Sequence, residues 1–389
     1  MFKTKNLLYA LLLFSLLFVA GCAQTPLDTS ESMSDMNAAL TEANTQSDAQ
    51  SEKTAANSRV ITDALGRSVE IPGHLERIVC GGVGALRYTT YLGAQDLVVG
   101  VSDAEIKEES SINRLYNYVN FDYFSKLPVI GSDMELNPEE IIKVDPQLIV
   151  LSKLSGDKAD QLQEKTAIPV VVVPGSDSAL DQACYDTLEL MGEVYGMQQE
   201  ARDLIAYLQG IELDLQNRVA SIPDEQKPSV YVGGVSYKGA RGFDGTEAHY
   251  APLALINAIN LADTTGQNGP FTVDIEQVLA WDPDYLFISL DNLSLIEKDY
   301  AEHPEYYQNF KAMQEGKVYS QIPFRYSAVN LDTALANTYY AAKILYPEQF
   351  QDIDIEEKTA EIYERLLGSN PYPDQKEQGF EFKQITLGN

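Results

Sequence analysis

Four short runs of apolar, mostly β-branched residues constrain the fold of this chain more than any other feature. Segments with helical spacing separate the runs, which lie at 77–80, 97–101, 148–151 and 170–173. Such runs are typical of parallel strands, because helices cover both faces of a parallel sheet and leave no face in water. Pro146 and Pro169 stand just before the last two runs, where a proline costs no hydrogen bond of the ladder.

A long helical segment follows at 198–222. It contains no proline and a single glycine, and Leu204, Leu208, Ile211 and Leu215 recur at helical spacing. A helix of about 25 residues is roughly 37 Å long, which is longer than most helices inside one compact domain. We therefore expect a rigid strut between two lobes.

The alternation of strand and helix then restarts. Strands are expected at 229–232, 285–288 and 317–319, and helices at 252–259 and 330–345. Two segments echo each other: 137–146 and 274–283 both contain a short acidic helix and an Asp-Pro pair, followed by an apolar strand. The pattern predicts an α/β fold of two lobes, each with a mainly parallel central sheet flanked by helices, joined by one long α-helix.

The N-terminus has the layout of a bacterial export signal. Lys3 and Lys5 precede an apolar run at 7–19, which is too short for a comfortable membrane span of about 20 residues. The segment 19–22 resembles a lipobox, which implies that Cys22 becomes the new N-terminus and carries diacylglycerol. An ordinary secretory peptide with a chance cysteine, or an uncleaved anchor, is the alternative.

Composition then divides the chain. Residues 22–58 are rich in Ser, Thr, Ala, Asn, Gln and Glu and contain no aromatic residue, so they cannot bury enough apolar surface to offset their ordering entropy. We predict a signal peptide, a disordered tether, an N-terminal lobe, a linker helix, a C-terminal lobe and a tail. Their respective bounds are 1–21, 22–58, 59–197, 198–222, 223–369 and 370–389.

The net charge of −30 argues against some partners. Nucleic acid and anionic lipid headgroups should repel so acidic a chain, and no nucleic-acid partner is expected. Cys80 and Cys184 could pair outside the cytoplasm, but their spacing does not demand it, and two buried thiols are favoured. No cysteine–histidine cluster suggests zinc, and the spacing of the three histidines does not support a metal site.

Several short motifs, in order, resemble the iron-complex-type periplasmic binding proteins of ABC importers, in the class with a helical backbone between the lobes. The resemblance covers about 59–367. The long helix matches the strut of that family. The other matching segments are 69–72, 76–79, 127–131, 137–141 and 145–149.

The resemblance implies a receptor that binds a siderophore, haem, cobalamin, molybdate or tungstate and delivers it to a membrane permease. It also implies salt bridges between a glutamate on each lobe and arginines of the permease. The matching positions are Glu139 and Glu276, in the two echoing segments. A glutamate that only favours the helix dipole in the first turn is the alternative reading.

Candidate ligand contacts lie just after the strands, because ligands of open α/β sheets bind outside the carboxyl ends of the strands. Three such loops pair arginine or lysine with tyrosine in an otherwise acidic chain. They supply Arg87 and Tyr88, then Tyr237, Lys238 and Arg241, and finally Arg325 and Tyr326.

Guanidinium groups bind carboxylate, catecholate or oxyanion oxygens by charge-assisted hydrogen bonds. We therefore expect an anionic ligand, first a ferric chelate such as a siderophore complex or haem, with molybdate, tungstate or cobalamin as the alternative. Direct ligation of iron by tyrosinates is less favoured, and no cofactor is expected besides the ligand.

The predicted function is that of a monomeric, lipid-anchored, extracytoplasmic receptor of an ABC importer. A ligand sensor of the same fold is the alternative from another class. The sequence contains no GxSxG or HExxH motif, and no Ser/His/Asp arrangement can be assembled from it, so no enzyme is predicted.

Overall fold

The computed structural model describes residues 58–107, 112–133, 135–153, 155–236, 238–326 and 328–388. These residues belong to one unit, Asn57–Asn389. The predicted signal peptide, Cys22, Tyr237 and all but the last residue of the predicted tether lie outside the described residues.

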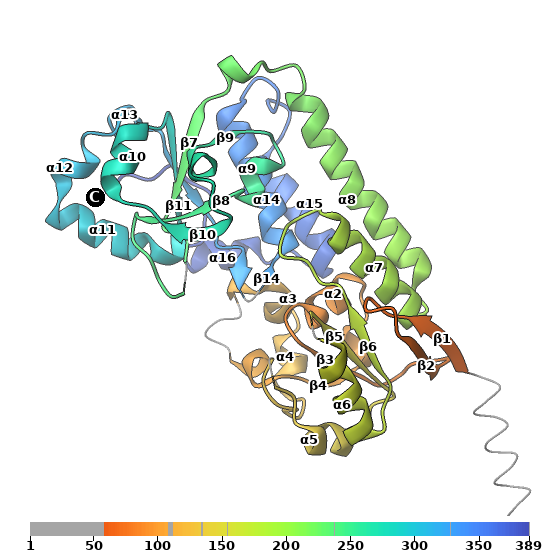
Figure 1. Cartoon of the computed structure of the whole chain (residues 1–389). Coiled ribbons are helices and arrows are strands. Elements are labelled where there is room, and N and C mark those ends of the chain that lie inside the picture. The colour runs from red at the N-terminus through yellow and green to blue at the C-terminus, as the bar shows by residue number, and fades with distance from the viewer. Residues whose placement is uncertain are drawn as a thin grey trace, which may run out of the picture. The chain divides into compact units, whose positions relative to one another are not determined.

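The first lobe is built around a four-stranded parallel sheet in the order β4-β3-β5-β6 (Figure 1). Every residue of β3, β5 and β6 is buried, as the apolar runs predict for a sheet covered on both faces. An antiparallel pair, β1 with β2, precedes the sheet. The strands are β1 (Ser58–Thr62), β2 (Ser68–Pro72), β3 (Ile78–Gly81), β4 (Val98–Gly100), β5 (Leu148–Ser152) and β6 (Val170–Val173), and the helices are α2 (Ala85–Tyr91), α3 (Leu115–Tyr118), α4 (Phe121–Phe124), α5 (Pro138–Lys143), α6 (Gly156–Thr166) and α7 (Gln182–Tyr195).

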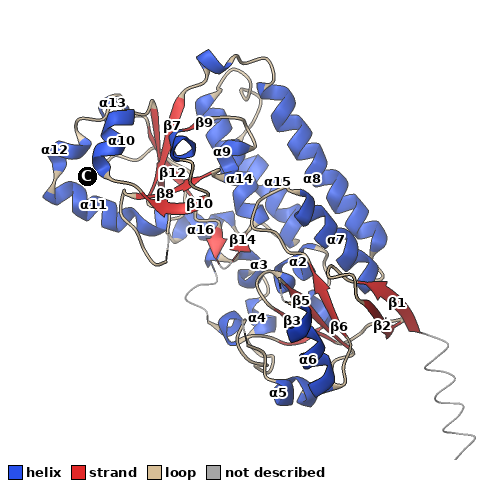
Figure 2. Cartoon of the chain, in the orientation of Figure 1, coloured by secondary structure: helices blue, strands red, loops and turns tan. Residues whose placement is uncertain are grey.

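The second lobe repeats this plan with a parallel sheet in the order β12-β11-β7-β9 (Figure 2). Two short antiparallel pairs, β8 with β10 and β13 with β14, accompany it. The strands are β7 (Ser229–Gly233), β8 (Gly245–Ala248), β9 (Ile259–Asn260), β10 (Gly269–Thr272), β11 (Tyr285–Ser289), β12 (Val318–Gln321), β13 (Arg325–Tyr326) and β14 (Ala328–Val329). The helices are α9 (Ala251–Ala254), α10 (Ile275–Trp281), α11 (Leu293–Glu302), α12 (Pro304–Tyr307), α13 (Lys311–Gln314), α14 (Leu331–Leu345), α15 (Ile355–Leu367) and α16 (Tyr372–Glu377).

The two lobes match strand for strand. In chain order, β3, β4, β5 and β6 occupy the places that β7, β9, β11 and β12 occupy in the second sheet. The echoing segments form equivalent crossovers, α5 into β5 and α10 into β11, and both turns place an aspartate at φ 45°, Asp145 and Asp282. Two positions after each of these aspartates, a side chain accepts hydrogen bonds at the start of a central strand. Gln147 accepts from the backbone N–H groups of Glu76 and Arg77, just before β3, and Asp284 accepts from the N–H and hydroxyl of Ser229, the first residue of β7. The sequence echo thus has a structural counterpart.

One long helix, α8 (Gln198–Val219), links the lobes, which confirms the predicted fold class. It ends three residues before the predicted end because Pro223 disfavours the helical conformation at Ile222. The expected helix at 252–259 was wrong in length: α9 ends at Ala254, and Asn257 has a φ of 50°. The domain boundaries of the sequence analysis remain a prediction.

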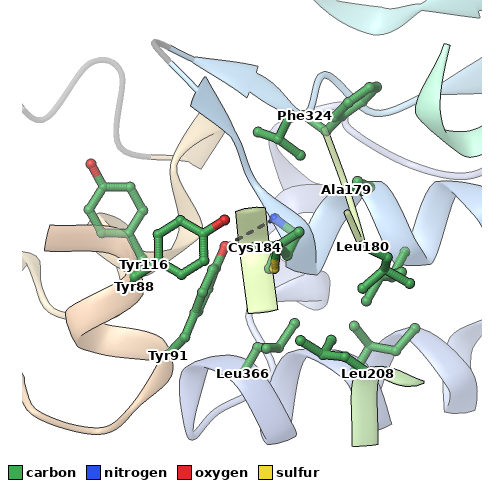
Figure 3. Close-up of a cluster of buried hydrophobic side chains, with 14 of the residues drawn as sticks. Tyr88, Tyr91, Tyr116, Ala179, Leu180, Cys184, Leu208, Phe324 and Leu366 are labelled. Atoms are coloured by element: carbon green, nitrogen blue, oxygen red, sulfur yellow. Dashed lines mark hydrogen bonds between the residues drawn. The ribbon is translucent and has the colours of Figure 1, made fainter. Parts of the chain in front are cut away.

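One large hydrophobic core extends through both lobes, beside two smaller clusters that each belong to one lobe. Its members include Tyr91 of α2, Leu208 of α8 and Leu366 of α15, which lie close together in Figure 3. Cys80 and Cys184 are buried in this core as thiols, and burial raises the pKa of Cys80 to about 11 and that of Cys184 to about 12. Because the core is continuous, the lobes are packed on each other and not merely tethered by α8.

Buried polar contacts cross the same boundary. Tyr91 Oη donates to Asp332 Oδ2 at 2.6 Å and accepts from the backbone N–H of Leu331 at 3.1 Å. Asp332 is fully buried at the start of α14. Asn330 Nδ2 donates to the carbonyl oxygen of Asn113 in the first lobe at 3.0 Å. These bonds fix α14 of the second lobe against the first lobe.

The C-terminal residues belong to the second lobe. Gln384 forms an isolated bridge with Tyr319 of β12, and Ile385 and Leu387 are buried against the second-lobe cluster. In the described part of the chain, no helix combines the length and apolar character that crossing a membrane requires.

Removing the Tyr91 hydroxyl should destabilise the fold. Tyr91→Phe leaves the buried Asp332 carboxylate without its donor from the first lobe, and we expect a loss of about 1–3 kcal/mol in the free energy of unfolding. Urea denaturation measures this loss. Tyr123→Phe, whose hydroxyl lies in a more exposed place on α4, serves as the control; equal effects of both substitutions would contradict the importance of the Tyr91–Asp332 bond.

The junction of α8 with the second lobe should make stability depend on pH. Two side-chain hydrogen bonds from Arg218 lower the pKa of Asp352 to about 2. Since an unfolded aspartate titrates near 3.9, the stabilisation is present above pH ~4 and is lost as the pH falls towards 2. Asp352→Asn should flatten the fall in melting temperature between these pH values. The control Asp122→Asn, at an exposed aspartate, should leave that fall in melting temperature as it is in the wild type. An unchanged profile for Asp352→Asn would refute the contribution of the Arg218–Asp352 pair to stability.

Candidate ligand-binding site

The loops at the carboxyl ends of the two sheets meet at the lobe boundary. Each loop after the first strand of its sheet begins with a glycine in the left-handed region, Gly82 with φ 73° and Gly234 with φ 79°. A Cβ at Gly82 would lie 2.4 Å from the carbonyl oxygen of Ser152, and one at Gly234 would lie 3.3 Å from that of Ser289. Glycine therefore lets each loop turn tightly over the neighbouring strand.

Arg87 crosses from the first lobe to the second. Its guanidinium donates to the carbonyl oxygens of Tyr326 at 3.0 Å and Val329 at 3.3 Å, and it lies 4.9 Å from the centre of the Tyr116 ring. Arg87 is 1% exposed, and its Nε is buried without a hydrogen-bond partner in the structure. Within the described residues, no carboxylate oxygen lies within 4 Å of this guanidinium. Arg87 is thus a buried cation whose contacts are neutral oxygens and a ring.

Arg325 crosses in the opposite direction. Its Nη1 donates to the carbonyl oxygen of Asp177 in the first lobe at 3.1 Å. Its Nε and Nη2 bind the two carboxylate oxygens of Glu247 at 2.9 and 2.5 Å. Burial raises the pKa of Glu247, and Arg325 opposes that rise. The charge of Arg325 is therefore compensated by a buried partner.

The two described tyrosines of the predicted site have different surroundings. Tyr88 lies in the hydrophobic core beside Tyr91 (Figure 3), and the centroids of the two rings, packed edge to face, are 5.9 Å apart. Burial raises the pKa of Tyr88 well above the usual range. Tyr326 is partly exposed and lies beneath the guanidinium of Arg114 at 4.7 Å. Arg87 contacts the main chain of Tyr326 through the hydrogen bond to its carbonyl oxygen. A ligand contact by either tyrosine stays a prediction.

Lys238 and Arg241 lie on the loop that follows β7. Lys238 is exposed with a φ of 51°, and Arg241 is partly exposed. Gly245 is required beside Arg241, because a Cβ at this glycine would lie 2.4 Å from the Cβ of Arg241. Their binding of a ligand stays a prediction.

Several polar residues of the boundary escaped the sequence analysis. Glu105 is buried and accepts hydrogen bonds from Arg114, Tyr116 and Asn117 at 3.1, 2.7 and 2.7 Å. Burial raises the pKa of Glu105, and Arg114 opposes that rise. Neither Glu105 nor Glu247 stands in a recognisable motif, so the sequence carries no signal that these acids are buried and paired.

The two predicted docking glutamates occupy equivalent, exposed places. Glu139 lies in the first turn of α5, where Asn137 caps the helix, and Glu276 lies in the first turn of α10. Among the described residues, no group of three or more His, Cys, Asp or Glu side chains is arranged to hold a metal ion.

A cavity of about 650 Å³ lies beside α8. It is lined by Ser178 and Ala179 of the first lobe, by the C-terminal half of α8, and by the start of α9 in the second lobe, with His249 next to it.

Curated relatives are similar to this chain at low identity. The molybdate-binding protein MolA of Haemophilus influenzae is 22% identical over 81% of this chain and 93% of its own length. The Fe(3+)-citrate-binding protein YfmC of Bacillus subtilis is 24% identical over 68% of this chain and 78% of its own. The ABC transporter substrate-binding lipoprotein YvrC of Bacillus subtilis, itself uncharacterised, is 23% identical over 59% of this chain and 64% of its own.

The fold is also that of solved binding proteins. The structure of MolA bound to molybdate matches 80% of this chain and 98% of its own, at 20% identity and a TM-score of 0.64. The sequence matches the family described as periplasmic binding protein over residues 78–323, more than half of the chain. The two lobes, the long helix α8 and the sequence all match the same family. The chain belongs to the periplasmic binding proteins of ABC transporters.

Proposed function

We propose that this protein is a lipid-anchored receptor that captures an anionic small ligand between its lobes and delivers it to the permease of an ABC importer. The observation that carries the proposal is Arg87, a buried guanidinium at the lobe boundary with neutral contacts. The membrane anchor is the diacylglycerol on Cys22, and the similarity to the lipoprotein YvrC supports it.

The physical argument rests on the surroundings of Arg87. A buried charge is costly unless it is paired, and carbonyl oxygens compensate it only in part. The hydrogen bonds from this guanidinium to carbonyl oxygens have an ionised donor and a neutral acceptor, whereas an anion supplies an ionised acceptor and adds a charge–charge attraction. A ligand with negatively charged oxygens therefore gains more from this guanidinium than the carbonyl oxygens of Tyr326 and Val329 do.

The first candidate ligand is an anionic ferric chelate, such as a siderophore complex or haem. The similarity to YfmC, named for ferric citrate, supports a carboxylate-rich iron complex. The second candidate is a tetrahedral oxyanion, molybdate or tungstate, because the similarity to MolA extends over more of the chain. Both classes present oxygen anions to a guanidinium fork.

Removal of the Arg87 charge should weaken binding of the anion. We expect Arg87→Met to lower the affinity for ferric citrate or molybdate by roughly 10- to 150-fold, which corresponds to one charge-assisted contact. Isothermal titration calorimetry, with a circular dichroism check of folding, measures the change. Arg87→Lys keeps the positive charge and should lose less affinity for the anion than Arg87→Met.

Arg202→Met is the matched control for Arg87→Met, because Arg202 is an exposed arginine on α8. The role of Arg87 is refuted if a folded Arg87→Met protein binds every tested anion as tightly as the wild type. Binding of none of the ferric chelates or oxyanions by the wild type would overturn the proposed ligand class.

Docking on the permease should depend on Glu139 and Glu276. Both carboxylates are exposed on equivalent helices, so they are available to cations of a partner without a prior rearrangement. We expect the double variant Glu139→Gln/Glu276→Gln to lower ligand import into cells by roughly tenfold or more, with ligand affinity unchanged. Uptake of labelled ligand, together with calorimetry on the purified variant, measures both quantities.

The double variant Glu164→Gln/Glu297→Gln removes two other exposed glutamates, one from α6 and one from α11, and is the control for charge. Wild-type import by the Glu139/Glu276 double variant would exclude this docking role.

A further inference from the structure

We propose that Glu247 is a positioning residue that holds Arg325 across the lobe boundary and thereby sets how tightly the lobes close. Glu247 belongs to none of the motifs that identify the family, and it is 1% exposed in β8. The inference concerns the ligand-free protein and rests on the proposed function only where it predicts the rate of ligand release.

The geometry of the guanidinium gives Glu247 this role. The two oxygens of Glu247 take up Nε and Nη2 of Arg325, which fixes the plane of the guanidinium. The remaining Nη1 then faces the first lobe and donates to the carbonyl oxygen of Asp177 at 3.1 Å. A bidentate pair restricts Arg325 to one orientation, so the bond to Asp177 forms with little further loss of side-chain entropy.

Glu247 is itself held firmly. Its backbone pairs with Pro270 in the register of β8 and β10, and its carbonyl oxygen accepts a hydrogen bond from Asn260 Nδ2 at 2.9 Å. The carboxylate therefore stays in place when the lobes move, and Arg325 moves with the second lobe.

The first-lobe acceptor is a preformed loop. Ser176 Oγ lies 2.7 Å from both the carbonyl oxygen of Ser178 and Asp181 Oδ1 and can donate its one proton to either, and the carboxylate of Asp177 pairs with Lys153. These bonds shape the loop from within the first lobe. Its carbonyl oxygen at Asp177 remains available to Arg325.

This end of the boundary has room to move. Ser178 and Ala179 border the cavity of about 650 Å³ beside α8, whereas the boundary at Tyr91 is filled by core side chains. Asp177 itself is exposed, so a change in lobe separation there alters this space before it reaches the buried Ala179 and Leu180 of the core. The Arg325–Asp177 bond is thus placed where a single contact can control closure.

Arg87 and Arg325 differ in their contacts. No carboxylate of the described residues contacts the guanidinium of Arg87, although the buried Glu105 lies near enough to interact with its charge, whereas Arg325 is paired directly with Glu247. We assign anion recognition to Arg87 and closure to the Glu247–Arg325 pair. Loss of Glu247 should loosen the lobes even when no ligand is present.

The test measures the separation of the lobes directly. Spin labels at Gln161→Cys in the first lobe and Lys298→Cys in the second are exposed, whereas Cys80 and Cys184 are buried. Double electron–electron resonance on the ligand-free protein should show a broader, longer distance distribution in Glu247→Gln than in the wild type. Arg325→Lys keeps a cation beside Glu247 but lacks the planar fork, and it should show the same change.

A matched control breaks an ion pair that does not cross the boundary. Glu356→Gln removes the partner of Lys376 within the second lobe and should leave the distance distribution unchanged. Because Arg325→Lys leaves Glu247 with a cation, it keeps the test decisive even if Glu247→Gln does not fold. Wild-type distributions in the folded variants would overturn the inference, whatever the ligand results.

Measurement of ligand release distinguishes this inference from the proposed function. With ferric citrate or molybdate as the probe, stopped-flow release should be about fivefold faster in Arg325→Lys than in the wild type, the change expected from the loss of one hydrogen bond of modest strength. Faster ligand release together with longer distances between the lobes supports the inference. An unchanged release rate from the folded variant contradicts the claim that the Glu247–Arg325 pair slows ligand release. Failure of the wild type to bind either probe would count against the ligand class, while the ligand-free distances would still decide the role of Glu247.

Discussion

Burial of apolar surface across the lobe boundary is the interaction on which the rest of this structure depends. One core joins α2, α8, α14 and α15, so the two lobes pack directly on each other and are not joined by a linker alone. A polar group within such a core generally needs a partner, and several groups at the boundary are paired: Tyr91 with Asp332, Arg114 with Glu105, Arg325 with Glu247. The proposed ligand site lies at this boundary, beside the carboxyl ends of the strands.

The same boundary separates two tasks that a receptor must perform. Recognition needs an electrostatic difference between the bound and empty states, and in the proposed function the buried Arg87, which contacts no carboxylate of the described residues, provides it. Closure needs a contact of modest strength that forms and breaks readily, and a carbonyl oxygen facing an already neutralised arginine provides that. Each arginine donates to main-chain oxygens of the other lobe, so the contact tolerates substitution of the side chains opposite.

The sequence predicted the architecture well because parallel sheets leave a strong pattern. The runs at β3, β5 and β6 are apolar throughout, and the stripe of Leu204, Leu208, Ile211 and Leu215 identified α8. The candidate site was predicted less completely. The sequence predicted that Arg87 and Tyr326 follow strands, and they meet from α2 and β13, but it could not show that Tyr88 turns into the core or that Glu247 pairs with Arg325. Those facts depend on side-chain direction and on contacts between residues far apart in the chain, which no local pattern records.

The strand-for-strand match of the two lobes has a consequence for how a partner protein can recognise such a receptor. An ancestral half-chain that was copied end to end would carry every exposed feature of its crossover helix twice, and α5 and α10 retain this relation down to the aspartate that ends each turn. A partner assembled from two copies of one subunit can then recognise both ends with a single kind of surface. One binding surface on the partner subunit would then have to evolve only once. A substitution that changed the docking surface of one lobe would be selected against, because the same partner surface must also fit the other lobe.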